Sequence, residues 1–185
     1  EEDEPNFTGS FYSFTKGLVE KLLKTYEKNT LVLRLRMPIS DDLSARNFIT
    51  KITKYRRVVN IPNSMTVLTD MLPIALTMQK RKLTGVFNYT NPDAISHVEI
   101  LKLYKEHIDP DFWYETFTEE EQNKILKAQR SNNTLDTTKI CEALPDVKIP
   151  PIHEAIVGVF ERMKANLIAA GNFPPPAAKP PRAED

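Results

Sequence analysis

Residues 10–37 read SFYSFTKGLVEKLLKTYEKNTLVLRLRM, a stretch that joins an amphipathic pattern directly to an apolar run. From about Ser10 to Glu27 the apolar residues recur at steps of three and four, with lysines and glutamates between them, which predicts a helix. The apolar run Leu31–Met37 ends at Pro38 and is typical of a buried strand in a parallel sheet. A helix that passes through a short turn into a buried strand indicates an α/β fold.

Shorter periodic and apolar segments continue this alternation along the chain. Further helices are predicted at about 47–55, 70–82, 96–107, 118–127, 136–144 and 152–169, and further strands at about 58–61, 65–67 and 85–89. Ser96 and Glu99 stand three residues apart, as do Thr118 and Glu121. Each pair predicts a capping box at the start of its helix.

The two ends of the sequence lack the pattern of a packed element. Residues 1–5 are acidic and end in proline, and residues 171–185 contain runs of proline among alanine and lysine. Such compositions cannot bury a core, so both ends are expected to be disordered. A polyproline ligand for an SH3-like groove is the alternative role for the tail.

Composition excludes several classes of protein. The 25 basic and 25 acidic residues cancel, so no net field favours nucleic acid or an anionic membrane, and no apolar run approaches the length of a membrane span. The single cysteine, Cys141, forms no internal disulfide, and the scattered His97, His107 and His153 show no metal-binding spacing. A reducing, cytoplasmic location is therefore expected. Cys141 itself is expected to be a small buried residue within its helix.

Tyr12 and Lys16 form the most suggestive chemical pair in the sequence. Residues four apart on a helix share one face, so a phenol and an ammonium group are presented to the same space. A phenol ordinarily titrates at about pH 10, and a nearby cation lowers that value, which suits a phenol to proton donation at neutral pH. The competing interpretation is an exposed lysine beside a half-buried tyrosine, because so short a spacing also arises by chance.

Six blocks of sequence, in order along the chain, carry a resemblance to a known family. They are Asn6–Lys16, Leu33–Ser40, Arg46–Ile52, Val58–Thr66, Leu83–Pro92 and Arg130–Asp136. Together they resemble the bifunctional nucleotide-rhamnose synthase/epimerase-reductase, which is also the C-terminal domain of plant-type UDP-rhamnose synthases. The last block is similar to an Arg-x-x-Asn-Ser-x-Leu element of bacterial dTDP-4-dehydrorhamnose reductases. The resemblance spans about residues 6–165, which makes it far more specific than a pair of residues.

The resemblance implies a fold and an activity. The fold is the C-terminal part of an extended short-chain dehydrogenase/reductase, with residues 6–38 as the last part of a Rossmann-like dinucleotide-binding domain. Residues 39–170 are then mainly a small mixed α/β substrate-binding subdomain with interleaved strands. The implied activity converts UDP-4-keto-6-deoxyglucose to UDP-L-rhamnose, by epimerisation at C3 and C5 and reduction of the C4 ketone. The implied cofactor is NADPH, with NADH as an option, and the sequence leaves UDP or dTDP open as the carrier.

Catalytic roles follow from the matching positions. The resemblance implies that Tyr12 is the proton donor to the C4 ketone. It also implies that Lys16 holds the ribose hydroxyls of the cofactor. It makes Lys51 one of the two acid/base groups of epimerisation, with a solvated helix lysine as the alternative. The second group, a cysteine, is expected upstream of Tyr12, and Cys141 is no substitute for it.

Binding roles are implied for five more residues. The turn formed by Met37, Pro38 and Ile39, directly after the strand, is expected to hold the nicotinamide. Arg130 is expected to pair with the substrate pyrophosphate, because a guanidinium group matches phosphate geometry; a capping or surface arginine is the alternative. Asn47 is expected to contact the sugar nucleotide, with a purely structural role as the alternative.

Part of the family's machinery has no counterpart in this sequence. None of its five glycines is spaced as a diphosphate-binding turn requires, so the chain alone is expected to bind NADPH poorly and to show no turnover. The strand after the first helix is expected to lie alone with an unpaired edge, and the helix Tyr12–Glu27 is a candidate homodimer interface. A truncated, non-catalytic reductase-like binding or regulatory protein is therefore the competing function.

Overall fold

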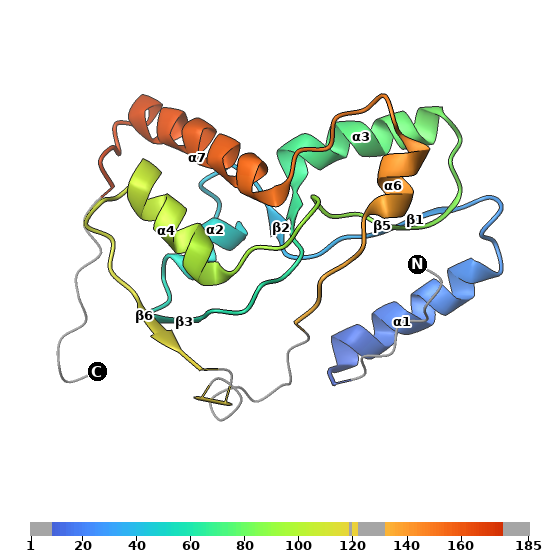
Figure 1. The fold of residues 1–185 in the computed structure, drawn as a ribbon, viewed down its shortest axis with the longest axis horizontal. Helices are drawn as coiled ribbons and strands as arrows, with labels where there is room; N and C mark the ends of the chain where they lie inside the picture. The colour runs from blue at the N-terminus through green and yellow to red at the C-terminus, as the bar shows by residue number, and fades with distance from the viewer. Residues whose placement is uncertain (1–8, 119, 122–131, 176–185) are drawn as a thin grey trace.

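The computed structural model describes residues 9–118, 120–121 and 132–175, and it has a mixed α/β fold (Figure 1). The helices are α1 (Phe11–Lys24), α2 (Phe48–Ile52), α3 (Leu68–Lys80), α4 (His97–His107), α6 (Thr138–Ala143) and α7 (Ile152–Ala169). The strands are β1 (Leu31–Arg34), β2 (Pro38–Ile39), β3 (Arg57–Val59), β4 (Thr66–Val67), β5 (Gly85–Asn88) and β6 (Glu115–Phe117). The predicted α/β class is confirmed. The lead-in 1–5, most of the predicted helix 118–127 and most of the tail 171–185 lie outside the described residues.

The strands pair in parallel, two by two, within the described part of the chain. β1 lies beside β5 with Leu31 opposite Gly85, β2 lies beside β4, and β3 lies beside β6. The expectation that the strand after the first helix lies alone is therefore wrong. Its partner β5 comes from a distant part of the chain, because parallel strands need a long crossover connection. Local sequence patterns do not reveal such a partner.

The larger hydrophobic core lies where α4 and α7 pack together beside β2, β4 and α2 (Figure 1). Its side chains without exposed surface include Ile39, Val67, Ile100, Ile156 and Phe160. α4 begins with the predicted capping box: Ser96 Oγ accepts from the Glu99 N–H, and the Glu99 carboxylate accepts from the Ser96 N–H. The apolar faces of the two helices thus close over the short strands.

A smaller core joins α3 and α6 to the β1–β5 pair. Met71, Met78 and Ile140 are fully buried there, and Tyr89 follows β5 into the same cluster. The Tyr89 hydroxyl donates to the carbonyl oxygen of Met71. Burial raises the pKa of Tyr89 to about 12. The neutral tyrosine therefore links strand and helix inside this core.

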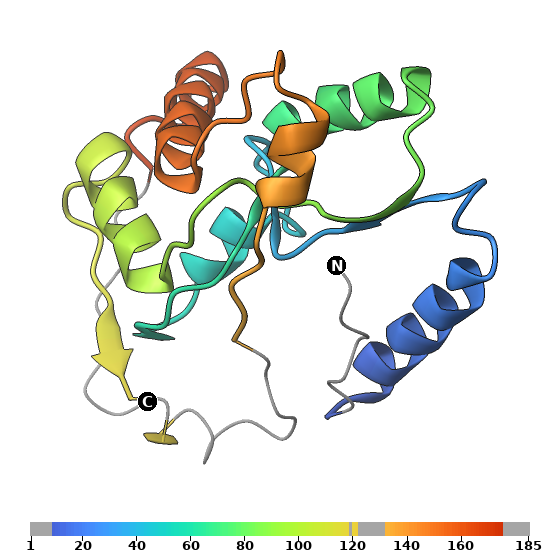
Figure 2. The same cartoon turned by 45° about the vertical axis from the view of Figure 1, so that its right-hand side comes forward.

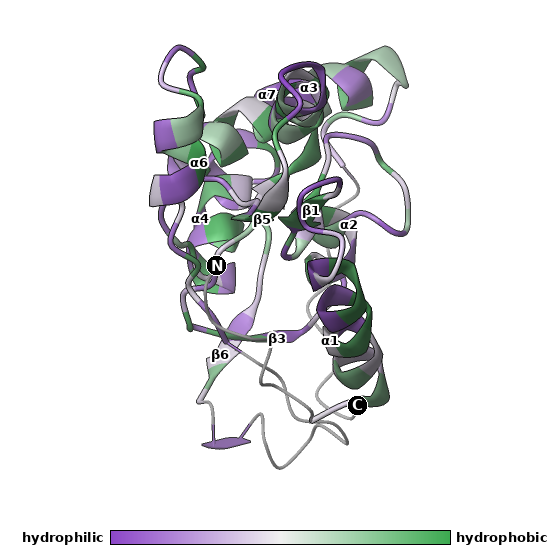
Figure 3. Cartoon of the chain, turned by 90° about the vertical axis from the view of Figure 1, so that its right-hand side faces the viewer, coloured by the Kyte–Doolittle hydropathy of each residue, from purple (hydrophilic) through white to green (hydrophobic). Residues whose placement is uncertain are grey.

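Helix α1 stands apart from both cores (Figures 1 and 2). None of its residues is buried, and Figure 3 shows apolar residues along its length. Its apolar side chains with at least 47% of their surface exposed are Phe11, Tyr12, Phe14, Leu18, Val19 and Leu22. An ion pair between Glu20 and Arg34 fastens the helix to β1, and these side chains are 17% and 21% exposed. No helix in the described part of the chain, α1 included, is both long and apolar enough to cross a bilayer.

Candidate active site

Tyr12 and Lys16, the Tyr/Lys pair, lie one turn apart in the first half of α1. The Lys16 ammonium nitrogen is 5.6 Å from the centroid of the Tyr12 ring, and 69% of the Tyr12 surface is exposed. Ser10 holds the start of the helix, since its Oγ accepts a hydrogen bond of 3.1 Å from the Ser13 N–H. The phenol and the ammonium group therefore share one accessible face and can act together on one bound molecule.

The turn after β1 is held in a strained conformation. Met37 has a φ angle of 38°, in the left-handed region that costs a residue with a side chain about 1–2 kcal/mol. On one side the Arg36 N–H donates to Thr66 Oγ1 (3.2 Å), and the Arg36 carbonyl accepts from the Thr66 N–H (2.9 Å). On the other side Pro38 and Ile39 pair with β4, which leaves Pro38 exposed and Ile39 fully buried. A ligand can therefore meet this turn through its backbone and Pro38, and not through the Ile39 side chain.

Asn47 joins the short helix α2 to the loop before it. Its side chain is buried, its Oδ1 accepts from the Ile49 N–H (3.3 Å), and its Nδ2 donates to the carbonyl oxygens of Ser40 (2.8 Å) and Asp42 (2.7 Å). These bonds cap the helix and fix the shape of the loop. Lys51, in the last turn of α2, is exposed and accessible to solvent.

The structure brings the expected site residues together in two groups. The Tyr/Lys pair forms one group on α1. Asn47 forms the other with the turn at Met37, because its side chain bonds to Ser40 beside that turn. Lys51 follows one turn later on α2, the helix that contacts β2. Figures 1 and 2 show α1 separated from α2, so the two groups lie apart in this structure. Arg130 lies outside the described residues.

A set of buried polar side chains that the sequence patterns do not predict lies around the carboxyl ends of β1 and β5. They are at most 5% exposed and comprise Asn63, Ser64, Thr66, Asn88, Thr90 and Asn91. Thr66 Oγ1 donates to the Tyr89 carbonyl (2.8 Å), and Asn91 Oδ1 accepts from the Val67 N–H (2.8 Å). Ligands of open parallel sheets bind at this end of the strands. Polar residues that directly follow apolar strand patterns are the signal that marks such a set.

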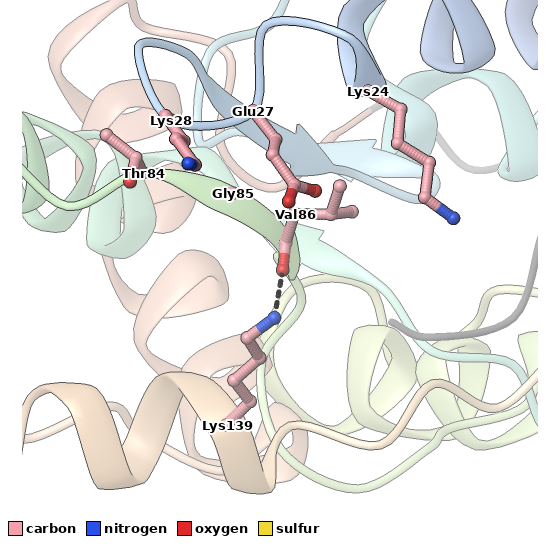
Figure 4. A pocket seen from close by; sticks show the side chains of 7 residues that line it. All are labelled: Lys24, Glu27, Lys28, Thr84, Gly85, Val86 and Lys139. Carbon is pink, nitrogen blue, oxygen red and sulfur yellow. Dashed lines mark hydrogen bonds between the residues drawn. The ribbon is translucent and has the colours of Figure 1, made fainter.

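A pocket of about 310 Å³ lies at the opposite end of β5, where the strand begins (Figure 4). Its lining residues are Lys24, Glu27, Lys28, Thr84, Gly85, Val86 and Lys139. Lys139 Nζ donates to the Val86 carbonyl oxygen (2.9 Å). None of the expected site residues that the structure describes lines this pocket, and ligands of parallel sheets favour the other end of the strands. The pocket is therefore distinct from the candidate active site.

The expectation that Cys141 is buried is wrong. Cys141 is exposed, whereas Ile140 and Leu144, which lie one turn apart, are buried. Neighbouring residues on a helix point about 100° apart, so the face of α6 that meets the core excludes Cys141.

The fold can be compared with solved structures. The chain matches the crystal structure of dTDP-4-dehydrorhamnose reductase from Bacillus anthracis in complex with NADP, with a TM-score of 0.63 and 16% identity, over 83% of this chain and 56% of the reductase. At that identity the likeness shows the fold alone. The fold is that of the extended short-chain dehydrogenases/reductases, and the predicted fold class is confirmed. No protein-family model matches the chain.

Two relatives with higher sequence identity show which enzymes within this fold class the chain resembles. The chain is 55% identical over 172 residues to a bifunctional dTDP-4-dehydrorhamnose 3,5-epimerase/dTDP-4-dehydrorhamnose reductase of Arabidopsis thaliana, which covers 92% of this chain and 56% of that enzyme. It is 44% identical to the L780 UDP-rhamnose synthase of Acanthamoeba polyphaga mimivirus, whose crystal structure matches with a TM-score of 0.82 over 87% of this chain and 55% of the synthase. The chain is thus a homologue of part of the bifunctional epimerase/reductase and of part of the UDP-rhamnose synthase, as the sequence blocks predict. It spans about half the length of the relatives it matches.

Proposed function

We propose that this chain is the part of an NADPH-dependent epimerase/reductase that carries the Tyr/Lys pair, and that the complete protein converts UDP-4-keto-6-deoxyglucose to UDP-L-rhamnose. The 55% identity to the Arabidopsis epimerase/reductase across 92% of the chain carries this proposal. The name of the mimivirus relative, a UDP-rhamnose synthase, favours UDP as the carrier.

Reduction of the C4 ketone is assigned to α1. The Tyr12 hydroxyl donates its proton to the C4 carbonyl oxygen, so that the C=O bond becomes an alcohol. NADPH, when bound, supplies the hydride to C4. The Lys16 ammonium group, 5.6 Å from the Tyr12 ring, would stabilise the phenolate that remains and would hold the ribose hydroxyls of the cofactor.

The cofactor assignment fits the groups present in this chain. Tyr12 and Lys16 offer an exposed hydroxyl and an exposed cation, and the turn at Met37, Pro38 and Ile39 offers backbone groups at the carboxyl end of β1. The bacterial reductase of the same fold is a complex with NADP. None of the five glycines forms a diphosphate-binding turn, so the diphosphate would contact a part of the protein outside this chain.

Epimerisation is assigned to Lys51 and to a second group outside this chain. Protons at C3 and C5 are acidified by the adjacent ketone, and the exposed amine of Lys51 can transfer one of them. Asn47 would act on the sugar nucleotide by holding the loop before α2, because its own polar atoms bond to that loop. Arg130 remains the proposed partner of the pyrophosphate.

The proposed protein is a homodimer and lies in the cytoplasm. The exposed apolar face of α1 would pair with α1 of a second copy, because an apolar helix face gains stability by leaving water. A cytoplasmic location suits a chain with one cysteine and a nucleotide-sugar substrate.

One experiment tests the activity directly. The complete protein is supplied with UDP-4-keto-6-deoxyglucose and NADPH, and the sugar product is identified by NMR while NADPH oxidation is followed. The expected product is UDP-L-rhamnose. Absence of NADPH oxidation and of product from the folded complete protein would favour the non-catalytic, reductase-like binding protein.

A further inference from the structure

Asn63 lies at the centre of the buried polar set and joins three separate segments. It is 1% exposed and precedes β4. Its backbone is fixed by a bridge to Ile95, because each residue donates its N–H to the carbonyl oxygen of the other at 3.1 Å. The amide side chain is therefore held at a defined point. Its Nδ2 donates to the Ile61 carbonyl oxygen of its own loop (3.2 Å), and the amide also bonds in two directions to two distant segments.

In the first direction Asn63 reaches the turn after β1. An Arg36 guanidinium nitrogen donates to Asn63 Oδ1 at 2.9 Å. Arg36 immediately precedes Met37, whose left-handed backbone forms the turn. A hydrogen bond from a charged donor is stronger than one between neutral groups. Asn63 therefore stabilises the start of the turn that is proposed to hold the nicotinamide.

In the second direction Asn63 reaches the segment that begins at Asn132. Its Oδ1 also accepts from the Asn133 N–H at 3.0 Å, and its Nδ2 donates to Asn132 Oδ1 at 3.3 Å. The neighbouring Ser64 adds two bonds to the same segment, from its N–H to the Asn133 carbonyl (3.0 Å) and from the Leu135 N–H to its Oγ (2.9 Å). This extended segment is thus held by Asn63 and Ser64 together.

We propose that Asn63 is a positioning residue that couples the cofactor turn at Met37 to the Asn132–Leu135 segment, called the substrate side because it follows Arg130, the proposed partner of the pyrophosphate. The inference rests on the proposed function and adds to it a residue that neither the Tyr/Lys pair nor Lys51 implies. One oxygen atom, Asn63 Oδ1, serves both directions at once, so loss of the amide removes a hydrogen bond from each segment. Ser64 bonds to the substrate-side segment alone, which makes Ser64 the matched control.

The test compares three variants of the complete protein, Asn63→Ala, Asn63→Asp and Ser64→Ala. NADPH binding is measured by fluorescence titration, binding of UDP-rhamnose by calorimetry, and the KM of each substrate by turnover. Asn63→Ala is expected to weaken both NADPH and nucleotide-sugar binding by about tenfold. Ser64→Ala is expected to weaken nucleotide-sugar binding only. Asn63→Asp keeps the Oδ1 acceptor for Arg36 and for the Asn133 N–H and loses the donor to Asn132, so it is expected to restore NADPH binding fully and sugar binding only in part.

The outcomes separate this inference from the proposed function. If the unsubstituted protein binds neither NADPH nor UDP-rhamnose, the proposed function fails. If it binds both, and Asn63→Ala leaves NADPH affinity unchanged, the coupling is absent and the inference is overturned. If Asn63→Ala fails to fold, Asn63→Asp becomes the test of the coupling. Equal weakening of NADPH binding and of UDP-rhamnose binding in Asn63→Asp would contradict the assigned contact with Arg36.

Discussion

Helices α7 and α1 are both amphipathic, but they lie in opposite environments. α7 buries Ile156, Val159 and Phe160 completely, whereas α1 buries none of its residues and Leu22 is 65% exposed. Complete burial of such side chains contributes about 1.5–3 kcal/mol each, so α7 contributes to the stability of the described structure and α1 contributes little. The Tyr/Lys pair resides on α1. Stability and the proposed reduction chemistry are therefore carried by different regions and can be tested separately.

Replacement of the proposed proton donor tests the chemistry of α1 with the largest expected effect. Tyr12→Phe removes the hydroxyl and is expected to lower NADPH-dependent ketone reduction by about 10²–10⁴-fold. Because 69% of the Tyr12 surface is exposed, the thermal unfolding midpoint should not change. Tyr26→Phe is the control, since Tyr26 follows the same helix and is 60% exposed. Equal losses of activity in the two variants would contradict the role of Tyr12.

Lys51 tests whether epimerisation belongs to the second group of site residues. Lys51→Met is expected to abolish exchange of the C3 and C5 protons, a loss of about 10²–10⁴-fold for a missing acid/base group. It should leave reduction of a ketone that is already epimerised. Incorporation of solvent deuterium, followed by mass spectrometry, measures proton exchange at C3 and C5. NADPH oxidation measures ketone reduction. Lys54→Met is the control, since Lys54 is also exposed just beyond α2; equal loss of both reactions in Lys51→Met would indicate a role in folding or binding.

A substitution that creates a cavity in the larger core tests how much the packing of α7 contributes to stability. Phe160→Ala is expected to lower the free energy of unfolding by about 3–5 kcal/mol, because Phe160 is fully buried between α4 and α7. Phe11→Ala, on α1, removes the same ring from a side chain that is 83% exposed, so in the monomeric chain, without the proposed α1–α1 pairing, it should change stability little. Chemical denaturation of the two variants measures both. Similar losses would show that α1 is packed against other parts of the protein in solution.

Long periodic elements could be predicted from the sequence because their signal is local. The predicted helix 152–169 coincides with α7, and the box of Ser96 and Glu99 opens α4 as expected. The four-residue spacing of the Tyr/Lys pair was likewise sufficient to place both groups on one face.

Features that depend on distant partners could not be predicted in this way. β6 (Glu115–Phe117) is three residues long and exists because it pairs with β3, and the pairing of β1 with β5 has the same origin. Asn63 lies in a polar loop by its sequence, and its importance comes from bonds to Arg36 and Asn133. Such contacts are set by the tertiary fold, which a local pattern does not contain.

Two tyrosines of the larger and smaller cores, the half-buried Tyr104 and the buried Tyr89, make the stability of the protein depend on pH. Burial raises the pKa of Tyr89 and of Tyr104 to about 12, above the value of about 10 for the unfolded chain. Each contributes stability that is fully present below about pH 10 and is lost as the pH rises toward 12, because only the unfolded state ionises in that window. Unfolding followed between these pH values should show this loss. Tyr89→Phe should reduce the pH dependence.

The two serine caps give the smallest and most direct comparison. Ser96 caps α4 within the core and Ser10 caps α1, and each side chain accepts a hydrogen bond from a backbone N–H three residues later. Removal of a cap costs about 0.5–2 kcal/mol in the helix that it begins. In Ser96→Ala this cost should appear in the free energy of global unfolding, since α4 unfolds with the core. In Ser10→Ala it should appear as faster amide hydrogen exchange in α1 alone, because an unburied helix can open without the core. A global loss of stability in Ser10→Ala as large as that in Ser96→Ala would show that α1 folds as one unit with the α4–α7 core.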